Sequence, residues 1–568
     1  MLGAAVATTF TLDLDAALVA PLAFAAFDAA GPGDPIAALE AIRSVADRLT
    51  VFCQAGEMRV PTAASDLFGF LEQVVHEVRR PRAGALFHPK MWLLRFVGEE
   101  EEQIRLVVPT RNLTNDVSWD AVLRLDGAPE GGPRASNRPL VELVRWCLDH
   151  TTIPVAPARR AQIESLLASV RRTRWEFPDG VNDMIFHALG VAGRSRPDFS
   201  GRRQLVISPF VNEEGLAVVA PSDDAVVIAR PEQLDLLPAA VLAGFDCRWI
   251  TSVGGDDDQA ASSLGDLHAK VVITERARRA HLFVGSANAT GAAFGGNIEL
   301  LVELAGGSAM LGIDATLDDL AKVLEPCKVE GGKEPSEADE LRKDLDDLLR
   351  DAATALLELC PTAEADKSFR VDITSATPLL PANHDGRATV ELLSRRGYAL
   401  DVPAGSAVSG AFASVPLADI TPFVVLQVEL QGPTQRVEGS TVIRANLLGD
   451  PPGRLDALIA RQVDSPAKFL RFLFLLLGLA NGGVPPWFQQ AISGDTDGRG
   501  NQHRDLVELG VFEALTRALV VNPSALDDLG GLIERLRSTE EGRATLPEGF
   551  NELWAAVAEA RRLVAAGS

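Results

Sequence analysis

The stretch from Leu267 to Glu299, LHAKVVITERARRAHLFVGSANATGAAFGGNIE, decides how the rest of the chain is interpreted. Its candidate site residues are His268, Lys270, Gly285, Ser286, Asn288 and Glu299. The runs Val271–Ile273 and Leu282–Val284 have the apolar, β-branched composition of strands, and a charged turn separates them. We therefore expect a hairpin that gathers an imidazole, an ammonium group and an amide at one edge of a sheet.

The same pattern occurs earlier in the chain, at Phe87–Asp120, which reads FHPKMWLLRFVGEEEEQIRLVVPTRNLTNDVSWD. Met91–Val97 and Ile104–Val108 are the expected strands of this second hairpin, around an acidic turn. The residues that correspond to those of the first stretch are His88, Lys90, Thr110, Asn112 and Asp120. The repeat predicts two similar halves, each of which supplies one His-Lys-Asn set.

Chance is a poor explanation for the two His-x-Lys pairs. Only 8 of the 568 residues are His. Lys90 and Lys270 are also the only lysines before Lys322. Two ordinary surface lysines would not be expected to fall in the same place relative to two histidines.

This duplicated pattern resembles the phospholipase D superfamily, whose signature is a paired His-x-Lys motif followed by a Gly-Ser/Thr-x-Asn segment. The family motif usually has an Asp a few residues after the Lys, and neither half of this chain carries it. The His-Lys-Asn form is instead similar to the tyrosyl-DNA phosphodiesterase branch and to related bacterial nuclease-like proteins. The resemblance implies two α-β-α lobes over about residues 5–310, with one active site between them.

The resemblance also implies roles for the individual residues. His88 would be the nucleophile that forms a phosphohistidine, and His268 the acid and base. Glu299 would orient His88, and Asp120 would orient His268, each from the opposite half. The lysines and asparagines would stabilise charge on the phosphoryl oxygens. Thr110 and Ser286 would donate further hydrogen bonds to the substrate, and Gly285 would let the backbone approach it.

The rest of the chain predicts an α/β protein with additional domains. Strand and helix patterns alternate before each motif. We expect an N-terminal lobe (1–175), a second lobe (176–315), a helical linker with a small β-rich domain (316–450) and a C-terminal helical domain (451–568). In the last of these, Arg454–Leu479 and Asp505–Ala566 have the pattern of helices.

The composition of the chain bears on its compartment, on metal or cofactor binding and on membrane insertion. The five cysteines are scattered and odd in number, which favours a reducing compartment and argues against a disulfide framework or a zinc site. No cofactor or metal is expected, and Asp256-Asp257-Asp258 is typical of a solvated loop rather than a metal site. The apolar N-terminus lacks a basic region, and the longest apolar stretch is too short to span a bilayer, so we expect a cytoplasmic protein.

The formal net charge of −24 argues against loose, sequence-independent coating of nucleic acid. It leaves room for a local positive cleft. The leading hypothesis is a metal-independent phosphodiesterase, a nuclease or DNA-end-processing enzyme, with DNA favoured over RNA and with a role in antiviral defence or DNA repair. A protein partner, such as a helicase or a defence-system component, would bring so acidic a chain to its substrate. The alternatives are a phospholipid-cleaving enzyme and a non-catalytic scaffold that binds nucleic acid.

Overall fold

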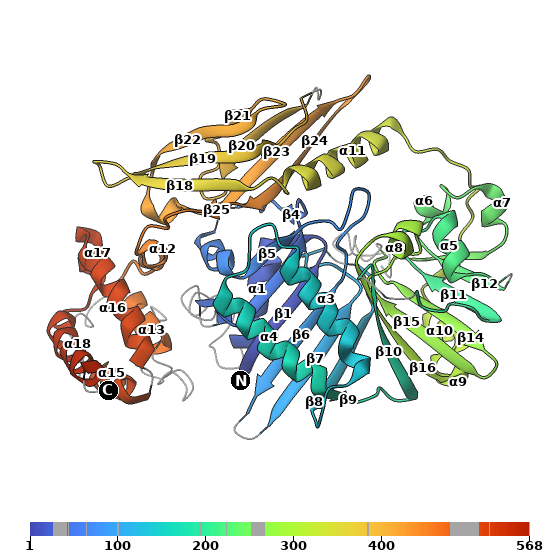
Figure 1. The fold of residues 1–568 in the computed structure, drawn as a ribbon, viewed down its shortest axis with the longest axis horizontal. Coiled ribbons are helices and arrows are strands. Elements are labelled where there is room, and N and C mark those ends of the chain that lie inside the picture. Colours follow the sequence, from blue (N-terminus) through green and yellow to red (C-terminus); the bar gives the residue numbers. More distant parts are fainter. Residues whose placement is uncertain are drawn as a thin grey trace, which may run out of the picture.

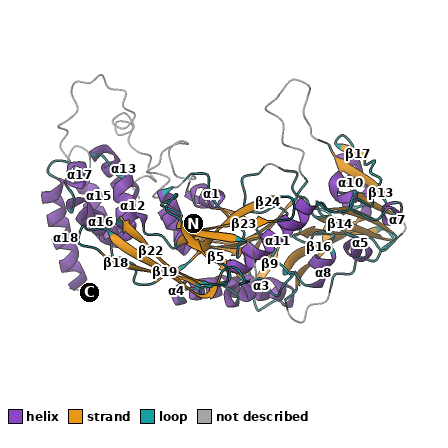
Figure 2. Cartoon of the chain, turned by 90° about the horizontal axis from the view of Figure 1, so that it is seen from above, coloured by secondary structure: helices purple, strands orange, loops and turns teal. Residues whose placement is uncertain are grey.

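The computed structural model describes residues 1–566 apart from 26–41, 44, 64, 99–100, 117, 192–195, 223, 252–266, 383–385, 477–510 and 522. The described chain forms two α/β lobes side by side, a β-rich domain above the first lobe, and a group of C-terminal helices (Figure 1). From above, the molecule is elongated, with the second lobe at one end and the C-terminal helices at the other (Figure 2). The predicted α/β class is confirmed.

Seven strands form the sheet of the first lobe, in the spatial order β5-β3-β1-β6-β7-β8-β9. They are β1 (Leu2–Thr9), β3 (Leu49–Gln54), β5 (Val75–Val78), β6 (Met91–Val97), β7 (Glu102–Pro109), β8 (Val122–Pro129) and β9 (Thr173–Trp175). β1, β3 and β5 are parallel, whereas β6 runs antiparallel to β1 and starts a meander. The other elements of this lobe are β2 (Leu12–Asp13), α1 (Leu14–Ala25), β4 (Met58–Arg59), η1 (Asp66–Gln73), η2 (Ala135–Asn137), α3 (Arg138–Asp149) and α4 (Pro157–Arg172).

The second lobe repeats this arrangement. Its strands are β10 (Val181–Leu189), β11 (Arg203–Ile207), β12 (Ala225–Ile228), β13 (Asp246–Ile250), β14 (Val271–Arg276), β15 (Arg279–Gly285), β16 (Glu299–Gly307) and β17 (Leu324–Pro326). β11, β12 and β13 are parallel, and β14 to β16 form the antiparallel meander. Its helices are α5 (Glu213–Val219), α6 (Pro231–Leu234), α7 (Ala239–Leu242), α8 (Gly291–Gly295), α9 (Ser308–Leu311) and α10 (Ile313–Leu320). The strands β6, β7, β14 and β15 are the two hairpins predicted from the motif stretches.

The second sheet reaches further along the chain than expected. β17 follows α10 and pairs antiparallel with β13, so the sheet continues to Pro326, past residue 315. This short strand covers the outer edge of β13, which would otherwise expose an unpaired row of backbone groups.

The two lobes share a hydrophobic core. Leu140 and Val144 of α3 belong to the same buried cluster as Ile298, which precedes β16, and as Leu300 and Val302 within it. Burial of apolar surface between the lobes therefore fixes them against each other, and it does so next to the ends of the motif hairpins.

The β-rich domain consists of two four-stranded sheets, β22-β19-β18-β25 and β21-β20-β23-β24, that share one core with α11. Its elements are α11 (Glu337–Ala352), β18 (Leu357–Ala363), β19 (Phe369–Pro378), β20 (Arg387–Leu392), β21 (Leu400–Val402), β22 (Ala407–Val415), η3 (Leu417–Asp419), β23 (Phe423–Gln431), β24 (Arg436–Arg444) and β25 (Asn446–Leu447). In Figure 1, α11 lies between this domain and the lobes.

The C-terminal helices are α12 (Arg454–Gln462), α13 (Pro466–Leu476), α15 (Val511–Val521), α16 (Pro523–Arg537), α17 (Glu540–Thr545) and α18 (Phe550–Ala566). The helical pattern that begins at Arg454 is divided into α12 and α13. Pro466 explains the break, because proline lacks a backbone N–H and is favoured at the first position of a helix. Among the described residues, none of the helices combines the length and apolar composition needed to cross a bilayer.

Candidate active site

The two motif sets meet where the lobes face each other. His88 and Lys90 directly precede β6, and His268 and Lys270 directly precede β14. The backbone N–H of His88 donates to Ile298 of the second lobe at 2.9 Å, and that of His268 donates to Trp119 of the first lobe at 2.8 Å. Each histidine is therefore anchored on the opposite lobe, and the site is built from both halves.

His88 is held by a carboxylate from the other lobe. Its Nδ1 lies 3.0 Å from Oε2 of Glu299, which is completely buried at the start of β16. An ionised carboxylate only accepts hydrogen bonds, so Nδ1 carries the proton and Nε2 presents its lone pair. This is the geometry expected if Glu299 orients His88, and that role stays a prediction.

Other groups fix Glu299 in this position. Its Oε2 also accepts a hydrogen bond from the Ser286 hydroxyl, and its Oε1 accepts one from Asn297 Nδ2 at 3.0 Å. Burial acts to raise the pKa of Glu299, but the neighbouring His88, Lys90 and Ser286 hold it below its usual value. The carboxylate is therefore ionised and immobile beside the imidazole.

Thr110 and Ser286 do not serve as expected. Both side chains are fully buried, and each hydroxyl donates to a carboxylate of its own half, Thr110 to Asp120 and Ser286 to Glu299. Since a hydroxyl has a single proton to donate, we correct their expected role: they orient the carboxylates, and they do not donate to the substrate. Gly285 has a packing reason of its own, because a Cβ there would lie 2.1 Å from the carbonyl oxygen of Leu300; its role in substrate approach stays a prediction.

The two lysines are buried within the site. Lys90 Nζ donates to the backbone oxygen of His88 at 3.0 Å. Lys270 Nζ donates to the backbone oxygens of His268 at 2.8 Å and of Thr110, across the lobes, at 3.1 Å. Burial, followed by the charge of Lys270, holds the pKa of Lys90 well below its ordinary value. Two amines buried close together form a site that favours an anion.

Burial also lowers the pKa of both histidines to about 4. For His88, Glu299 opposes the shift and the two lysines add to it. For His268, Lys270 and Arg230 are the main charges that add to it. Both rings are therefore neutral at pH 7 when no anion is bound.

Asp120 occupies the place in the first half that Glu299 has in the second. Its Oδ1 accepts from the backbone N–H of Thr110 at 3.1 Å as well as from its hydroxyl. Its contact with His268 stays a prediction. Sequence reasoning missed a second carboxylate, Asp116, whose Oδ2 lies 4.0 Å from His268 Nε2. The only available signal was its place in the loop after Asn112.

In each half, a side chain binds the backbone of the residue that precedes the histidine, but the two side chains differ in charge and in hydrogen-bond direction. Oε1 of Gln54, at the end of β3, accepts the backbone N–H of Phe87 at 2.8 Å. Arg230, just after β12, donates to the carbonyl oxygen of Leu267 at 3.2 and 3.0 Å. The second half thus has a positive charge beside its histidine where the first half has a neutral amide. Neither residue was identified from the sequence.

Asn112 and Asn288 occupy equivalent places, each three residues after the end of its strand. Their side-chain oxygens are buried and have no hydrogen-bond partner among the described residues. Buried polar atoms normally have a partner, so this pair marks room for a polar ligand. Asn112, Asp116 and Asp120 also line a pocket of about 650 Å³ that continues along Trp92.

Two further expectations concern regions away from this site. The triplet at 256–258 lies outside the described residues. Within the described part of the chain, no group of three or more His, Cys, Asp or Glu side chains is placed to hold a metal ion. Another His–Glu cluster joins His187 and His281 to Glu303 at 2.8 and 2.7 Å, on the second sheet and apart from the motif residues.

No protein-family model and no curated protein matches this chain. Among solved structures, the chain is similar to a mutant of yeast tyrosyl-DNA phosphodiesterase, with a TM-score of 0.34 and 11% identity, over 55% of this chain and 84% of that one. It is also similar to polyphosphate kinase from Porphyromonas gingivalis, with a TM-score of 0.31 and 11% identity, over 61% of this chain and 49% of that one. Likeness of this degree does not establish a family, and the assignment below rests on the geometry of the site.

Proposed function

We propose that this chain is a phosphodiesterase of the phospholipase D type that works through a phosphohistidine intermediate and acts on nucleic acid. One observation carries the proposal: two His-Lys-Asn sets from different lobes form one buried site, in which Glu299 of one half holds the His88 ring of the other at 3.0 Å. This arrangement supplies a nucleophile, a proton donor and charge-stabilising groups in a single place.

In the first step, Nε2 of His88 attacks phosphorus, so that a P–N bond forms and the P–O bond to the leaving group breaks. The leaving oxygen takes a proton from the His268 ring. Charge that develops on the phosphoryl oxygens is stabilised by Lys90 and Lys270 and by the amides of Asn112 and Asn288. Glu299 stabilises the positive charge that His88 acquires when it forms the bond.

In the second step, His268 takes a proton from water, and the resulting hydroxide oxygen attacks phosphorus. The P–N bond breaks, and its electron pair returns to Nε2 of His88. The product is a phosphate monoester, and His268 is again protonated. No step requires a metal ion.

The protonation of His268 depends on the substrate. Lys270 and Arg230 contribute to the lowering of its pKa to about 4. A phosphodiester bound between the lysines brings a negative charge that offsets them, so the pKa of His268 rises on binding. We therefore expect His268, the general acid, to become protonated when the substrate binds.

Nucleic acid is the substrate class that we favour, with DNA ahead of RNA. Support comes from the motif form and from the positive groups beside the site, Arg230 and the two lysines. The acidity of the whole chain supports delivery by a protein partner, as in a repair or antiviral defence assembly in the cytoplasm. These features belong to the proposal and require their own tests.

The test is cleavage of labelled single- and double-stranded DNA in excess EDTA. Wild type would be compared with His88→Ala, His268→Ala and, as a control outside the site, His187→Ala. We expect cleavage by wild type and the control and loss of cleavage in both site variants. With bis(4-nitrophenyl) phosphate, whose leaving group needs no proton, His268→Asn should accumulate a covalent adduct at His88, because only the second step still requires His268.

Other outcomes would overturn parts of the proposal. Cleavage that EDTA abolishes would refute the metal-independent mechanism. Phosphatidylcholine vesicles, tested in parallel, would reveal a lipid substrate if they alone are hydrolysed. Turnover of neither nucleic acid nor lipid would favour the scaffold role over an enzyme.

A further inference from the structure

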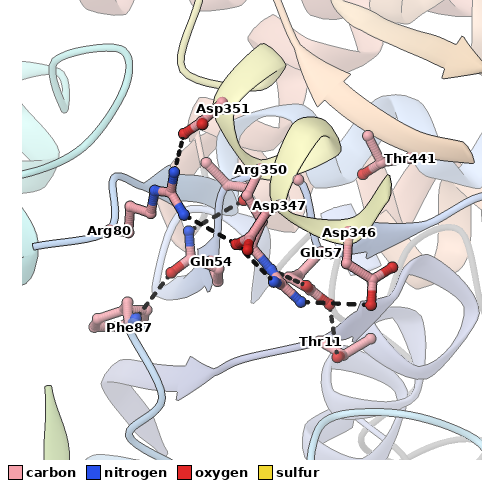
Figure 3. A network of polar contacts seen from close by, with 12 residues as sticks. Thr11, Gln54, Glu57, Arg80, Phe87, Asp346, Asp347, Arg350, Asp351 and Thr441 are labelled. Atoms are coloured by element: carbon pink, nitrogen blue, oxygen red, sulfur yellow. Dashed lines mark hydrogen bonds and ion pairs between the residues drawn. The ribbon is translucent and has the colours of Figure 1, made fainter. Parts of the chain in front are cut away.

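The β-rich domain reaches the active site through α11. The C-terminal end of this helix packs directly against the loop that follows β3 in the first lobe (Figure 3). Gly56 makes this contact possible, because a Cβ there would lie 2.6 Å from the Cα of Arg350 and 2.8 Å from the carbonyl oxygen of Leu349. Its φ of +82° also favours glycine. Backbone therefore meets backbone at this point.

Arg350 extends from α11 into the first lobe. Its Nε donates to Glu57 Oε1 at 2.7 Å, and its side chain is only 13% exposed. The guanidinium carbon lies 5.5 Å from the ring centre of Phe10, which follows β1. The same ring is 5.1 Å from the ring of His88, and Lys90 Nζ lies 5.9 Å from its centre. Phe10 is thus in contact with Arg350 and with both members of the first catalytic pair.

The loop that Arg350 holds is also bound to the segment that carries His88. Glu57 accepts a hydrogen bond from the Thr11 hydroxyl at 3.3 Å. Gln54 accepts the backbone N–H of Phe87, the residue before His88. Arg350 therefore restrains the ring behind His88, through Phe10, and the loop beside it, through Glu57.

The positive charge of Arg350 also affects the protonation of Glu57 and, through Glu57, of Lys90. Burial raises the pKa of Glu57, and Arg350 opposes that rise. Glu57 is one of the carboxylates that favour the protonated form of Lys90. Without the guanidinium, Glu57 would more readily take up a proton, and Lys90 would lose part of its support. The same helix also docks through Arg80, which donates to Asp347, an acceptor that it shares with Arg350, and to Asp351.

We propose that Arg350 is a positioning residue for His88 and Lys90, so that the β-rich domain completes the first half of the active site. This inference rests on the proposed function. It assigns the domain a part in the reaction, as the element that keeps the nucleophile in place.

The test compares Arg350→Ala with Asp351→Asn, a matched control that weakens docking of the same helix and leaves Phe10 untouched. With bis(4-nitrophenyl) phosphate, we expect Arg350→Ala to lower kcat about tenfold or more, as misplacement of a catalytic group does. KM should change little, and Asp351→Asn should resemble wild type. Phe10→Leu should also lower kcat, and the double variant with Arg350→Ala should lose less than the product of the two single losses, because both act through one contact.

The inference would be overturned if Arg350→Ala and Asp351→Asn behaved alike, or if the effects of Arg350→Ala and Phe10→Leu multiplied independently. A wild type without activity would refute the proposed function instead. In that case, carbethoxylation of His88 by diethyl pyrocarbonate, followed by mass spectrometry, decides the question. We expect faster modification of His88 in Arg350→Ala than in Asp351→Asn, and equal rates would refute the role of Arg350.

Discussion

Replacement of Glu299 by Gln is the most direct test of how the two lobes share one site. Gln keeps the size of the side chain and removes its charge. In the first step His88 becomes positively charged while its Nδ1 lies 3.0 Å from Glu299 Oε2. With the charge centres about 4 Å apart, the interaction is worth about 4 kcal/mol at an effective dielectric constant of about 20.

That energy sets the size of the expected effect. About 4 kcal/mol corresponds to roughly a 10³-fold change in rate. The Gln oxygen can still accept the Nδ1–H of His88, which retains part of the interaction. We therefore expect kcat of Glu299→Gln to fall by about 10²- to 10³-fold, with a smaller effect on KM, because the charge interaction appears only as the reaction proceeds.

The assay is initial-rate hydrolysis of bis(4-nitrophenyl) phosphate and of labelled single-stranded DNA in EDTA. Glu303→Gln is a matched control, because Glu303 lies on the same strand and also binds two histidines, His187 at 2.8 Å and His281 at 2.7 Å. A Glu299→Gln enzyme within about threefold of wild type would refute the reasoning. So would an equal loss in Glu303→Gln, which would mean that any buried His–Glu contact in this sheet matters only for folding.

Three further predictions concern charge and stability. Lys270→Met should lower kcat/KM by about 10²- to 10³-fold, the usual loss of a group that stabilises a developing oxyanion; a change below about threefold would count against its role. Glu72→Ala removes the buried carboxylate that binds the Arg454 guanidinium at 2.7 Å and leaves Arg454 with the half-exposed Asp450 and a backbone oxygen, so the free energy of unfolding should fall by about 1.5–3 kcal/mol; an unchanged melting temperature would contradict this. Burial lowers the pKa of His76 to about 3. Below about pH 6.5 the unfolded chain therefore binds a proton at His76 that the folded chain does not bind. Lower pH then reduces the free energy of unfolding by up to about 1.4 kcal/mol per pH unit. His76→Leu should therefore lose less melting temperature than wild type between pH 7 and 5, and equal losses would refute this.

The parts of the site that the sequence predicts correctly are local. The hairpins follow from apolar runs on either side of a charged turn, and a hairpin brings the start of one strand beside the end of the next. His88, Lys90 and Asn112 therefore come together for reasons contained in about 25 residues of sequence. The partnership of Glu299 with His88 was expected only from family resemblance, since the two residues are 211 positions apart.

The parts of the site that the sequence does not predict depend on contacts between distant residues, or on which of two acceptors receives the hydrogen bond of a hydroxyl group. Arg350 meets Phe10 across 340 positions, and nothing in the composition of α11 distinguishes Arg350 from the other charged residues of that acidic helix. Ser286 has the chemistry to bind a phosphate. Its hydroxyl instead donates to Glu299, because a fully buried carboxylate without hydrogen-bond donors would cost free energy. The hydrogen-bond partner of such a hydroxyl depends on burial, and a sequence motif does not show which groups are buried.

The duplicated halves differ where their chemistry must differ. A double displacement needs one histidine that attacks and another that gives and takes protons, and two identical environments would not separate these tasks. His88 has a buried carboxylate on Nδ1, which favours the positive charge that the nucleophile acquires, and a neutral amide, Gln54, beside its backbone. His268 has Arg230 beside it, so its proton is bound weakly until an anion arrives and is given up readily afterwards. Arg350 extends this difference, because it supports only the half that contains His88. Within the proposed mechanism, these differences favour His88 as the nucleophile and His268 as the acid and base.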